Sequence, residues 1–211
     1  MGCIKAIAAA VLCFGVLFLL VFGWVVYQHY KHMTVRESIS VPLPDGVHMV
    51  KHSRIGINPV VAEYDRDVTY VSNGVRGKTT PLAVDTCGGY PINCYLIEGP
   101  DGPLLRLDDA LREHLLDFSS ETTYLVIRFK GTGFIGEVAN GGYTDASVSY
   151  VDDDPATAEV EICGKKAIPM VEVTQGAPET YLGRIEGGTG RLRFTTAEES
   201  PEGAIEHRHE W

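Results

Sequence analysis

The feature that most constrains this chain is an uncharged run of twenty-two residues near its N-terminus, Ala6 to Tyr27. In a helix that rises about 1.5 Å per residue, the run spans about 33 Å, enough to cross a hydrocarbon layer of about 30 Å. Lys5 precedes the run, and aromatic residues and Lys31 follow it, as is typical of membrane interfaces. The sequence therefore predicts a transmembrane anchor over residues 1–30 and a lipid bilayer as its partner.

A cleaved signal peptide is the alternative interpretation of this segment. Such peptides have an apolar core of about 7–15 residues that ends in a small-residue cleavage site. The run in this chain is longer, and the residues after it, Val25 to His29, contain no such site. Acylation at Gly2 is disfavoured because that pattern requires Ser or Thr where this chain has Ala6. We expect an uncleaved anchor.

The orientation of the anchor does not follow from its flanking charges. Lys5 and the α-amine precede the helix, and Lys31 and Arg36 follow it, so the positive-inside rule is nearly balanced. A short head followed by a long domain is the usual layout of an uncleaved signal anchor. We therefore expect the domain outside the cytoplasm, and in the periplasm if the source is bacterial.

The rest of the chain is long enough for one domain with a substantial core. Residues 31–78 carry seven Lys/Arg against five Asp/Glu, whereas residues 79–211 carry ten against twenty-three. Anionic headgroups favour the first part beside a bilayer and repel the second. Binding to DNA or RNA requires a concentrated Lys/Arg surface, so we expect no nucleic-acid partner.

Turn signals divide the domain into short segments with strand-like patterns. Asn73-Gly74 follows residues 67–72 (DVTYVS), and both central positions of a type I′ hairpin turn need a positive φ. Further turn signals stand at 44–46, 99–103 and 187–190, each between apolar segments.

Apolar and polar side chains alternate around these turns. In residues 159–162, valine and isoleucine alternate with glutamates, and Leu125, Ile127 and Phe129 follow the same period of two. This period predicts strands that are buried on one face. We expect a mainly β fold, an antiparallel β-sandwich or barrel-like domain over residues 31–197, and a polar tail over 198–211.

One segment fits a helix as well as strands. Leucines and a phenylalanine share a helical face over Leu107 to Phe118, with Asp108 as a possible N-cap. Alternatively, a single helical turn at 109–112 leads into a hairpin, with strands at 114–118 and 124–130 around Ser119-Ser120-Glu121. We favour the hairpin.

The glycines at 131, 133 and 136 match the G-x-G-x-x-G spacing of nucleotide-binding loops. That function requires a helix that begins in the motif, and the residues after Val138 include Gly141-Gly142, which would break it. We predict a glycine-rich β turn and no nucleotide cofactor.

Several acidic and histidine-containing segments are conceivable metal sites. Asp152 to Asp154 lacks the alternating ligands of a calcium loop, and Asp65-Arg66-Asp67 presents two carboxylates on one strand face without further context. His207 and His209 lie in the polar tail, and the spacing of His48 and His52 separates them by about 13 Å along a strand. We predict no metal site.

The cysteines permit one disulfide. Cys87 and Cys94 flank a sequence with two glycines and a proline, so the two thiols can pair across a turn in an oxidising compartment. Two ordinary half-buried thiols are the alternative, and we expect Cys163 to remain a free thiol. The chain has no C-x2-C pair, which excludes the common zinc patterns.

No coherent set of catalytic residues emerges from the sequence. Catalysis by Cys87 or Cys163 would need His114 and an orienting group nearby in space, and nothing local indicates this. We expect a single-pass membrane protein whose β domain binds other membrane or envelope proteins without catalysing a reaction. The alternative is a membrane-tethered hydrolase of envelope material that uses the acidic distal half of the chain. Its activity would be lost on mutation of Asp108 or Cys87.

Overall fold

The computed structural model describes residues 2–34, 36–58, 63–82, 91–109, 112–138, 146–149, 159–162, 164–187 and 191–200. One long helix, α1 (Gly2–Thr34), precedes a β-rich domain with one short helix, α2 (Met170–Thr174). The strands are β1 (Arg36–Pro42), β2 (His48–Asn58), β3 (Glu63–Ser72), β4 (Val75–Pro81), β5 (Ile92–Gly99), β6 (Gly102–Asp108), β7 (Glu113–Asp117), β8 (Thr122–Phe129), β9 (Thr132–Glu137), β10 (Ala146–Ser149), β11 (Glu159–Ile162), β12 (Lys165–Lys166), β13 (Ile168–Pro169), β14 (Glu179–Glu186) and β15 (Arg193–Thr196).

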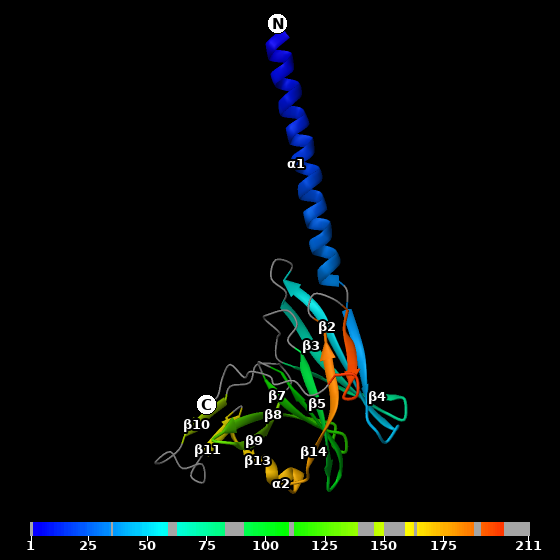
Figure 1. The fold of residues 1–211 in the computed structure, drawn as a ribbon. Helices are drawn as coiled ribbons and strands as arrows, with labels where there is room; N and C mark the ends of the chain where they lie inside the picture. The colour runs from blue at the N-terminus through cyan, green and yellow to red at the C-terminus, as the bar shows by residue number, and fades with distance from the viewer. Residues whose placement is uncertain are drawn as a thin grey trace.

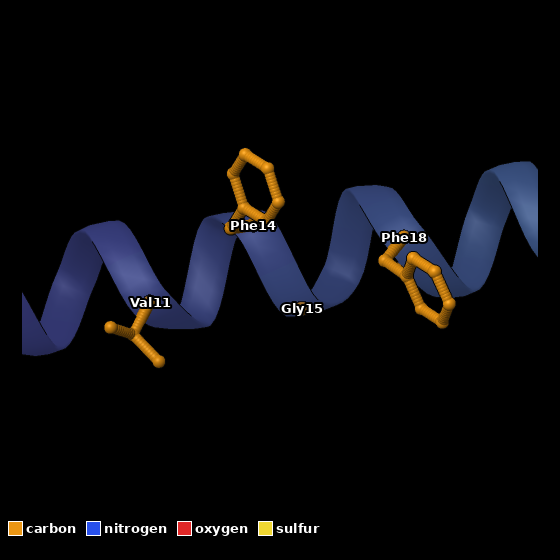
Figure 2. A pocket seen from close by; sticks show the side chains of 4 residues that line it. All are labelled: Val11, Phe14, Gly15 and Phe18. Carbon is orange, nitrogen blue, oxygen red and sulfur yellow. The ribbon is translucent and has the colours of Figure 1, made fainter.

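The long helix α1 projects away from the β domain (Figure 1). It contains a span, Val11–Gln28, that is long and apolar enough to cross a membrane, and none of this span is buried against the rest of the protein. Figure 2 shows Val11, Phe14 and Phe18 extending from the helix around Gly15, where they line an apolar groove. The apolar side chains along the whole span Val11–Gln28 are unfavourable in water, so the helix favours a lipid or protein environment.

The domain is built from antiparallel sheets. One sheet has the order β1-β2-β3-β4, and a second has the order β13-β9-β8-β7-β6-β5-β14-β15. A small third sheet has the order β10-β11-β12. The four-stranded and eight-stranded sheets face each other as two layers, which confirms the predicted mainly β fold and selects a sandwich-like arrangement over a barrel (Figure 1).

The predicted turns at 44–46, 73–74 and 99–103 each join two paired antiparallel strands, whereas residues 188–190 of the turn predicted at 187–190 lie outside the described residues. Asn73 has a φ of 51° and Gly74 a φ of 75°, as a type I′ turn requires, and they join β3 to β4. The ambiguous segment at 107–118 forms strands rather than a helix, because β6 pairs with β7 and β7 with β8. Asp109 N donates to Arg112 O across the connection between β6 and β7, and residues 110–111 lie outside the described part of the chain.

The main core lies between the two large sheets. The four-stranded sheet contributes the buried residues Val41, Leu43, Val50, Val68, Tyr70 and Leu82, and the eight-stranded sheet and its turns contribute Ile92, Cys94, Leu105, Leu107, Leu116, Phe118 and Ile185. Leu125, Ile127 and Phe129 of β8 point to the same face of their sheet and pack against the small third sheet.

The prediction that strands are buried on one face is wrong for β8. Val126 lies on the opposite face from Leu125 and Ile127, yet it is also buried, where it packs with Ile135 and with Met170 of α2. The physical reason is that α2 covers this part of the second face, a long-range contact that the strand's own alternation does not report.

The glycine-rich segment after β8 is a turn only at its start, and its second and third glycines, Gly133 and Gly136, lie in strand β9. Lys130 and Gly131 have φ angles of 50° and 83°, and they join β8 to β9. Gly136 lies further along β9, where the Cβ of any larger residue would stand 2.6 Å from Cβ of Ile162. The third glycine of the motif is therefore required for close packing of β9 against the third sheet.

The two ends of the predicted domain lie next to well-defined elements. Helix α1 continues to Thr34, and β1 begins at Arg36. After β15, Ser200 N donates to Thr196 O. The remainder of the polar tail, 201–211, lies outside the described residues.

A Gly136→Ala substitution should destabilise the domain by about 1–3 kcal/mol, because the added methyl group forces Ile162 or the β9 backbone to move. Gly133→Ala in the same strand is the matched control, since its Cβ would meet Met170 at 3.4 Å. Urea unfolding of the full chain in detergent, followed by circular dichroism, measures both variants. Equal midpoints for the two variants would contradict the packing argument.

Candidate functional site

Two clusters of polar and charged residues lie on opposite faces of the eight-stranded sheet. We call them the outer cluster (Tyr95, Arg106, Asp108, Glu113, Arg128 and Glu179) and the inter-sheet cluster (His52, Arg66, Asp109 and His114). Most of their members are buried, but Arg128 and Glu179 are exposed. Arg106 belongs to the outer face because its neighbours in β6, Leu105 and Leu107, point into the core between the sheets. Of these residues, the sequence suggests only Asp108 and His114 as catalytic candidates.

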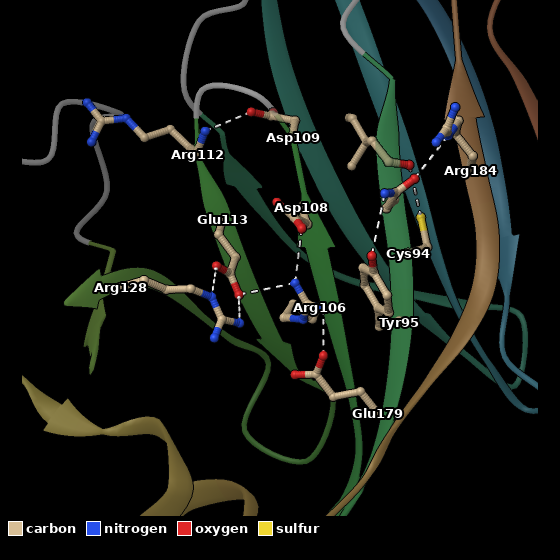
Figure 3. Close-up of polar contacts among 12 residues, drawn as sticks. Cys94, Tyr95, Arg106, Asp108, Asp109, Arg112, Glu113, Arg128, Glu179 and Arg184 are labelled. Carbon is tan, nitrogen blue, oxygen red and sulfur yellow. Dashed lines mark hydrogen bonds and ion pairs between the residues drawn. The ribbon is translucent and has the colours of Figure 1, made fainter. Parts of the chain in front are cut away.

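Arg106 is the centre of the outer cluster (Figure 3). Its guanidinium lies 3.2 Å from the carboxylate of Asp108 and 3.3 Å from that of Glu113. The other terminal nitrogen donates to Glu179 at 2.5 Å, and the guanidinium carbon stands 3.8 Å from the centre of the Tyr95 ring. Four strands, β5, β6, β7 and β14, therefore converge on one buried arginine.

Glu113 connects a second arginine to this cluster. Arg128 of β8 donates from Nε at 2.8 Å and from Nη2 at 2.6 Å, so its contact with the Glu113 carboxylate is bidentate. The hydrogen bonds and charge of Glu113 raise the pKa of Arg128. Burial lowers the pKa of Arg106, but the charges of Glu113 and Glu179 outweigh it, and the pKa is raised overall. Both arginines stay charged at any physiological pH.

This outer cluster is suited to holding strands together rather than to chemistry. Its two guanidiniums are engaged by carboxylates, so neither is available as an electrophile for a substrate. Asp108, the residue named for the hydrolase alternative, is itself buried and lies against Arg106. A catalytic carboxylate would need contact with a substrate in a cleft, and this carboxylate lies against the arginine instead.

The inter-sheet cluster contains a buried ion pair that connects the two layers. Arg66 of β3 donates to Asp109 at 2.6 Å, and both side chains are at least 96% buried. Asp109 also accepts a hydrogen bond from the backbone N of Arg112 at 2.7 Å, which places its carboxylate at the start of the β6–β7 connection. The ion pair therefore fixes the position of the four-stranded sheet relative to this connection.

Two histidines share this buried space. Burial lowers the pKa of His52 to about 3, and the charges of Arg66 and Arg54 add to the effect. Burial likewise lowers the pKa of His114 to about 4, against the opposing effect of Asp109. Both imidazoles are therefore neutral at neutral pH, and both are secluded from solvent, so they lack the access to substrate that a general base requires.

The predicted pairing of Cys87 with Cys94 stays a prediction. Cys94 lies fully buried in β5, and burial raises the pKa of its thiol, which disfavours the reactive thiolate. Cys87 and Cys163 lie outside the described residues, and so does any contact that either would make with His114. Cys13 is exposed on α1.

The segments weighed above as metal sites are separated in the part of the fold that is described. Asp67 pairs with Arg36 at 2.8 Å, while Arg66 between the two aspartates points inward. His48 and His52 both lie on strand β2, as expected. His48 contacts Asp45 at 2.7 Å, whereas His52 is buried between the sheets. Residues 152–154, His207 and His209 lie outside the described residues. In the part of the chain that the structure describes, no group of three or more His, Cys, Asp or Glu side chains is arranged to hold a metal ion.

Sequence reasoning missed both clusters, although one signal was present. A charged residue inside an apolar strand, such as Arg106 in the segment 104–108 (LLRLD), must either reach solvent or find a buried partner. The sequence indicates that such a partner is needed but not where it lies, because Glu179 is 73 residues away in the chain.

Comparison with known proteins adds no functional assignment. No protein-family model, no curated protein and no solved structure matches this chain. The interpretation of the protein therefore depends on its own residues and their arrangement.

The two buried histidines predict that the domain loses stability as the pH falls. Their pKa values in the folded domain lie below the value of about 6.5 expected in an unfolded chain. Above pH 6.5 both histidines are neutral in the folded and the unfolded state, so they do not reduce the free energy of unfolding there. Each histidine should reduce the free energy of unfolding by about 1.4 kcal/mol per pH unit below that point, down to its folded pKa.

Thermal unfolding of the full chain at pH 7, 6 and 5 measures this dependence. His52→Gln and His114→Gln should each flatten the slope, because the substituted amide binds no proton in this range. His48→Gln is the control, since His48 is only partly buried and contacts Asp45. A slope unchanged in both core variants would show that other groups cause the acid sensitivity.

Proposed function

We propose that this protein is a single-pass membrane protein that presents a non-catalytic β-sandwich domain to other membrane or envelope proteins. The observation that carries the proposal is the combination of an exposed apolar helix with a domain whose far end is a set of rigidly connected turns. The helix attaches the protein to the bilayer, and the turns supply the contact surface.

The membrane attachment is supported by the environment of α1. Its large apolar residues from Val11 to Tyr27 are between 47% and 76% exposed, so the helix is not a core element of the described domain. Transfer of this surface from water to lipid is worth about 25 cal/mol per Å². A bilayer is the solvent that satisfies such a helix along its whole length.

The far end of the sandwich lies opposite α1, because β2 runs from this end at His48 towards α1 at Asn58 (Figure 1). We call it the distal platform and define it by three turns, residues 43–48, 73–75 and 117–121. Valines 47 and 75 expose 37% and 70% of their surface on this platform.

Hydrogen bonds and ring contacts connect the three turns. Asn73 N donates to Val47 O at 2.9 Å, and Lys78 N donates to the Glu121 carboxylate at 2.9 Å. The His48 ring meets the Phe118 ring edge to face, with centroids 5.3 Å apart. The platform therefore presents its exposed valines on turns that are already ordered, which reduces the entropy lost when a partner binds.

The turns are also ordered internally. Asp45 accepts hydrogen bonds from the backbone N atoms of Val47 and His48, both at 2.9 Å. Asp117 accepts from Ser119 N at 2.8 Å and from Ser120 N at 3.3 Å.

Burial raises the pKa of both aspartates, but hydrogen bonds outweigh it and lower the pKa overall. For Asp45 these are mainly the bonds from His48, and for Asp117 mainly the bonds from the Ser119 and Ser120 hydroxyls at 2.8 Å. Both carboxylates therefore stay negatively charged down to acidic pH. A partner surface with basic and apolar residues would complement the platform.

Site-specific photo-cross-linking in the native membrane tests this proposal. A photoreactive amino acid at position 75 should give defined adducts with one or a few membrane or envelope proteins, identified by mass spectrometry. Position 165, on an exposed residue of β12 away from the platform, is the matched control. Adducts should be lost when Asp45→Asn and Asp117→Asn are combined with the probe. Adducts that are the same from both positions, or absent from both, would refute the platform as the contact surface.

We also propose that the domain lies outside the cytoplasm. Its support is the pair Cys87 and Cys94, whose predicted disulfide would suit an oxidising compartment. An alkaline phosphatase fused after Trp211 should be active, because this enzyme needs an oxidising compartment to form its disulfides. An inactive phosphatase, together with an active cytoplasmic reporter at the same position, would reverse the orientation.

A further inference from the structure

The end of the β2–β3 hairpin lies beside the end of α1. Strand β2 contacts α1, and in Figure 1 the tip of β2 stands next to the last turns of the helix. This arrangement follows from chain direction, since α1 ends at Thr34, β1 begins at Arg36, and the antiparallel β2 runs back towards the helix. The hairpin end is the part of the described domain nearest the proposed bilayer.

The tip of β2 and the end of the apolar span of α1 can be compared by their positions along the axis of the helix. Gln28 ends the apolar span and lies six residues before Thr34, so the helix extends about 9 Å beyond the hydrocarbon layer. Ile55 pairs with Arg36 at the start of β1. The following residues up to Asn58 extend about 10 Å further at 3.3 Å per residue. Arg36 lies beyond Thr34, so the tip of β2 reaches back to the level of the last turns of α1, within about 9 Å of the hydrocarbon layer (Figure 1).

The headgroup region occupies this height. A bilayer is about 40–45 Å thick including its headgroups and about 30 Å without them, which leaves about 5–8 Å on each side. The hairpin end thus overlaps the headgroup layer on geometric grounds, whichever side of the membrane the domain occupies.

The chemistry of the hairpin end suits that layer. Ile55, Gly56 and Ile57 are half-buried and uncharged, and the next four residues in the sequence, 59–62, which lie outside the described residues, also carry no charge. Tyr64 on β3 stacks against Arg54, whose guanidinium carbon lies 4.3 Å from the ring centre. Arg54 itself is buried and pairs with Glu37 at 2.8 Å, so its role is to hold the half-buried Tyr64 ring in place. Tyrosine rings are favoured at the membrane interface.

The same hairpin also limits the depth of insertion. Glu63 and Asp65 lie on β3 close to its start, and Asp65 is exposed opposite Ile55 in the register. Carboxylates are costly in hydrocarbon but remain hydrated among headgroups. Contact is therefore confined to the headgroup layer and the ends of the acyl chains.

We infer that the β2–β3 hairpin end, Ile55–Asn58 with Tyr64, is a second membrane contact that rests in the lipid headgroup layer beside α1. This inference rests on the proposed membrane attachment of α1. Its consequence is that the domain is held in one orientation on the bilayer, with the distal platform facing away from the lipid. A single helix alone would leave the orientation of the domain on the bilayer unfixed.

The test uses the full chain in phosphatidylcholine vesicles that contain no other protein. An environment-sensitive fluorescent amino acid replaces Ile57, and in a matched control it replaces Val75, which is 70% exposed on the distal platform. Emission is compared between ordinary vesicles and vesicles brominated close to the headgroup, using only protein that floats with the lipid. Position 57 should show a blue shift and a loss of emission in the brominated vesicles, whereas position 75 should show neither.

Each outcome of this test has a defined meaning. Unchanged emission at position 57 in protein that floats would overturn the second contact while leaving the anchor intact. Quenching at both positions would also overturn it, because the domain would then have no fixed orientation. Protein that fails to float would refute the membrane anchor itself, and with it this inference. The same probe at position 55 should give the same blue shift and quenching as at position 57. Circular dichroism of each variant checks that the substitution has not unfolded the domain.

Discussion

The apolar layer between the four-stranded and the eight-stranded sheet is the constraint on which the rest of the structure depends. Val41, Val50 and Val68 from one sheet meet Leu105, Leu107 and Ile185 from the other, and each is no more than 1% exposed. Full burial of such a side chain contributes about 1.5–3 kcal/mol. Neither sheet could keep its inner face in water, so the two layers form together.

This layer is closed by different interactions at its two ends. At the far end, Tyr70 and Phe118 pack edge to face, and the Tyr70 hydroxyl donates to Thr122 O at 2.8 Å. At the end towards α1, the Arg66–Asp109 ion pair takes the place of apolar contacts. A buried ion pair adds little net stability, but loss of one partner is costly. We interpret it as the contact that sets how the sheets align at the end near α1, while the aromatic contacts hold the turns of the distal platform.

Burial also explains why the polar clusters are poor candidates for catalysis. An active site requires charged groups that are accessible and only partly satisfied, as in a cleft. In the described part of the domain, Arg106 lies against three carboxylates, and the two core histidines are held neutral by desolvation. Functional contact is therefore better sought at the surface, where the two ends of the sandwich differ: one lies beside α1, and the other, the distal platform, lies away from it.

Local rules were sufficient for much of this fold. The uncharged run predicts α1 because its length and polarity depend on no other part of the chain, and Asn73-Gly74 predicts a hairpin because its backbone needs positive φ. Segment 107–118 was ambiguous, since the same leucines fit a helical face or two strands, and only pairing of β7 with β6 and β8 selected strands. The second buried face of β8 and the contacts Arg66–Asp109 and Arg106–Glu179 were likewise decided by tertiary structure. The physical reason is that hydropathy and turn geometry act within a few residues, whereas the partner of a buried charge depends on which distant strands become neighbours.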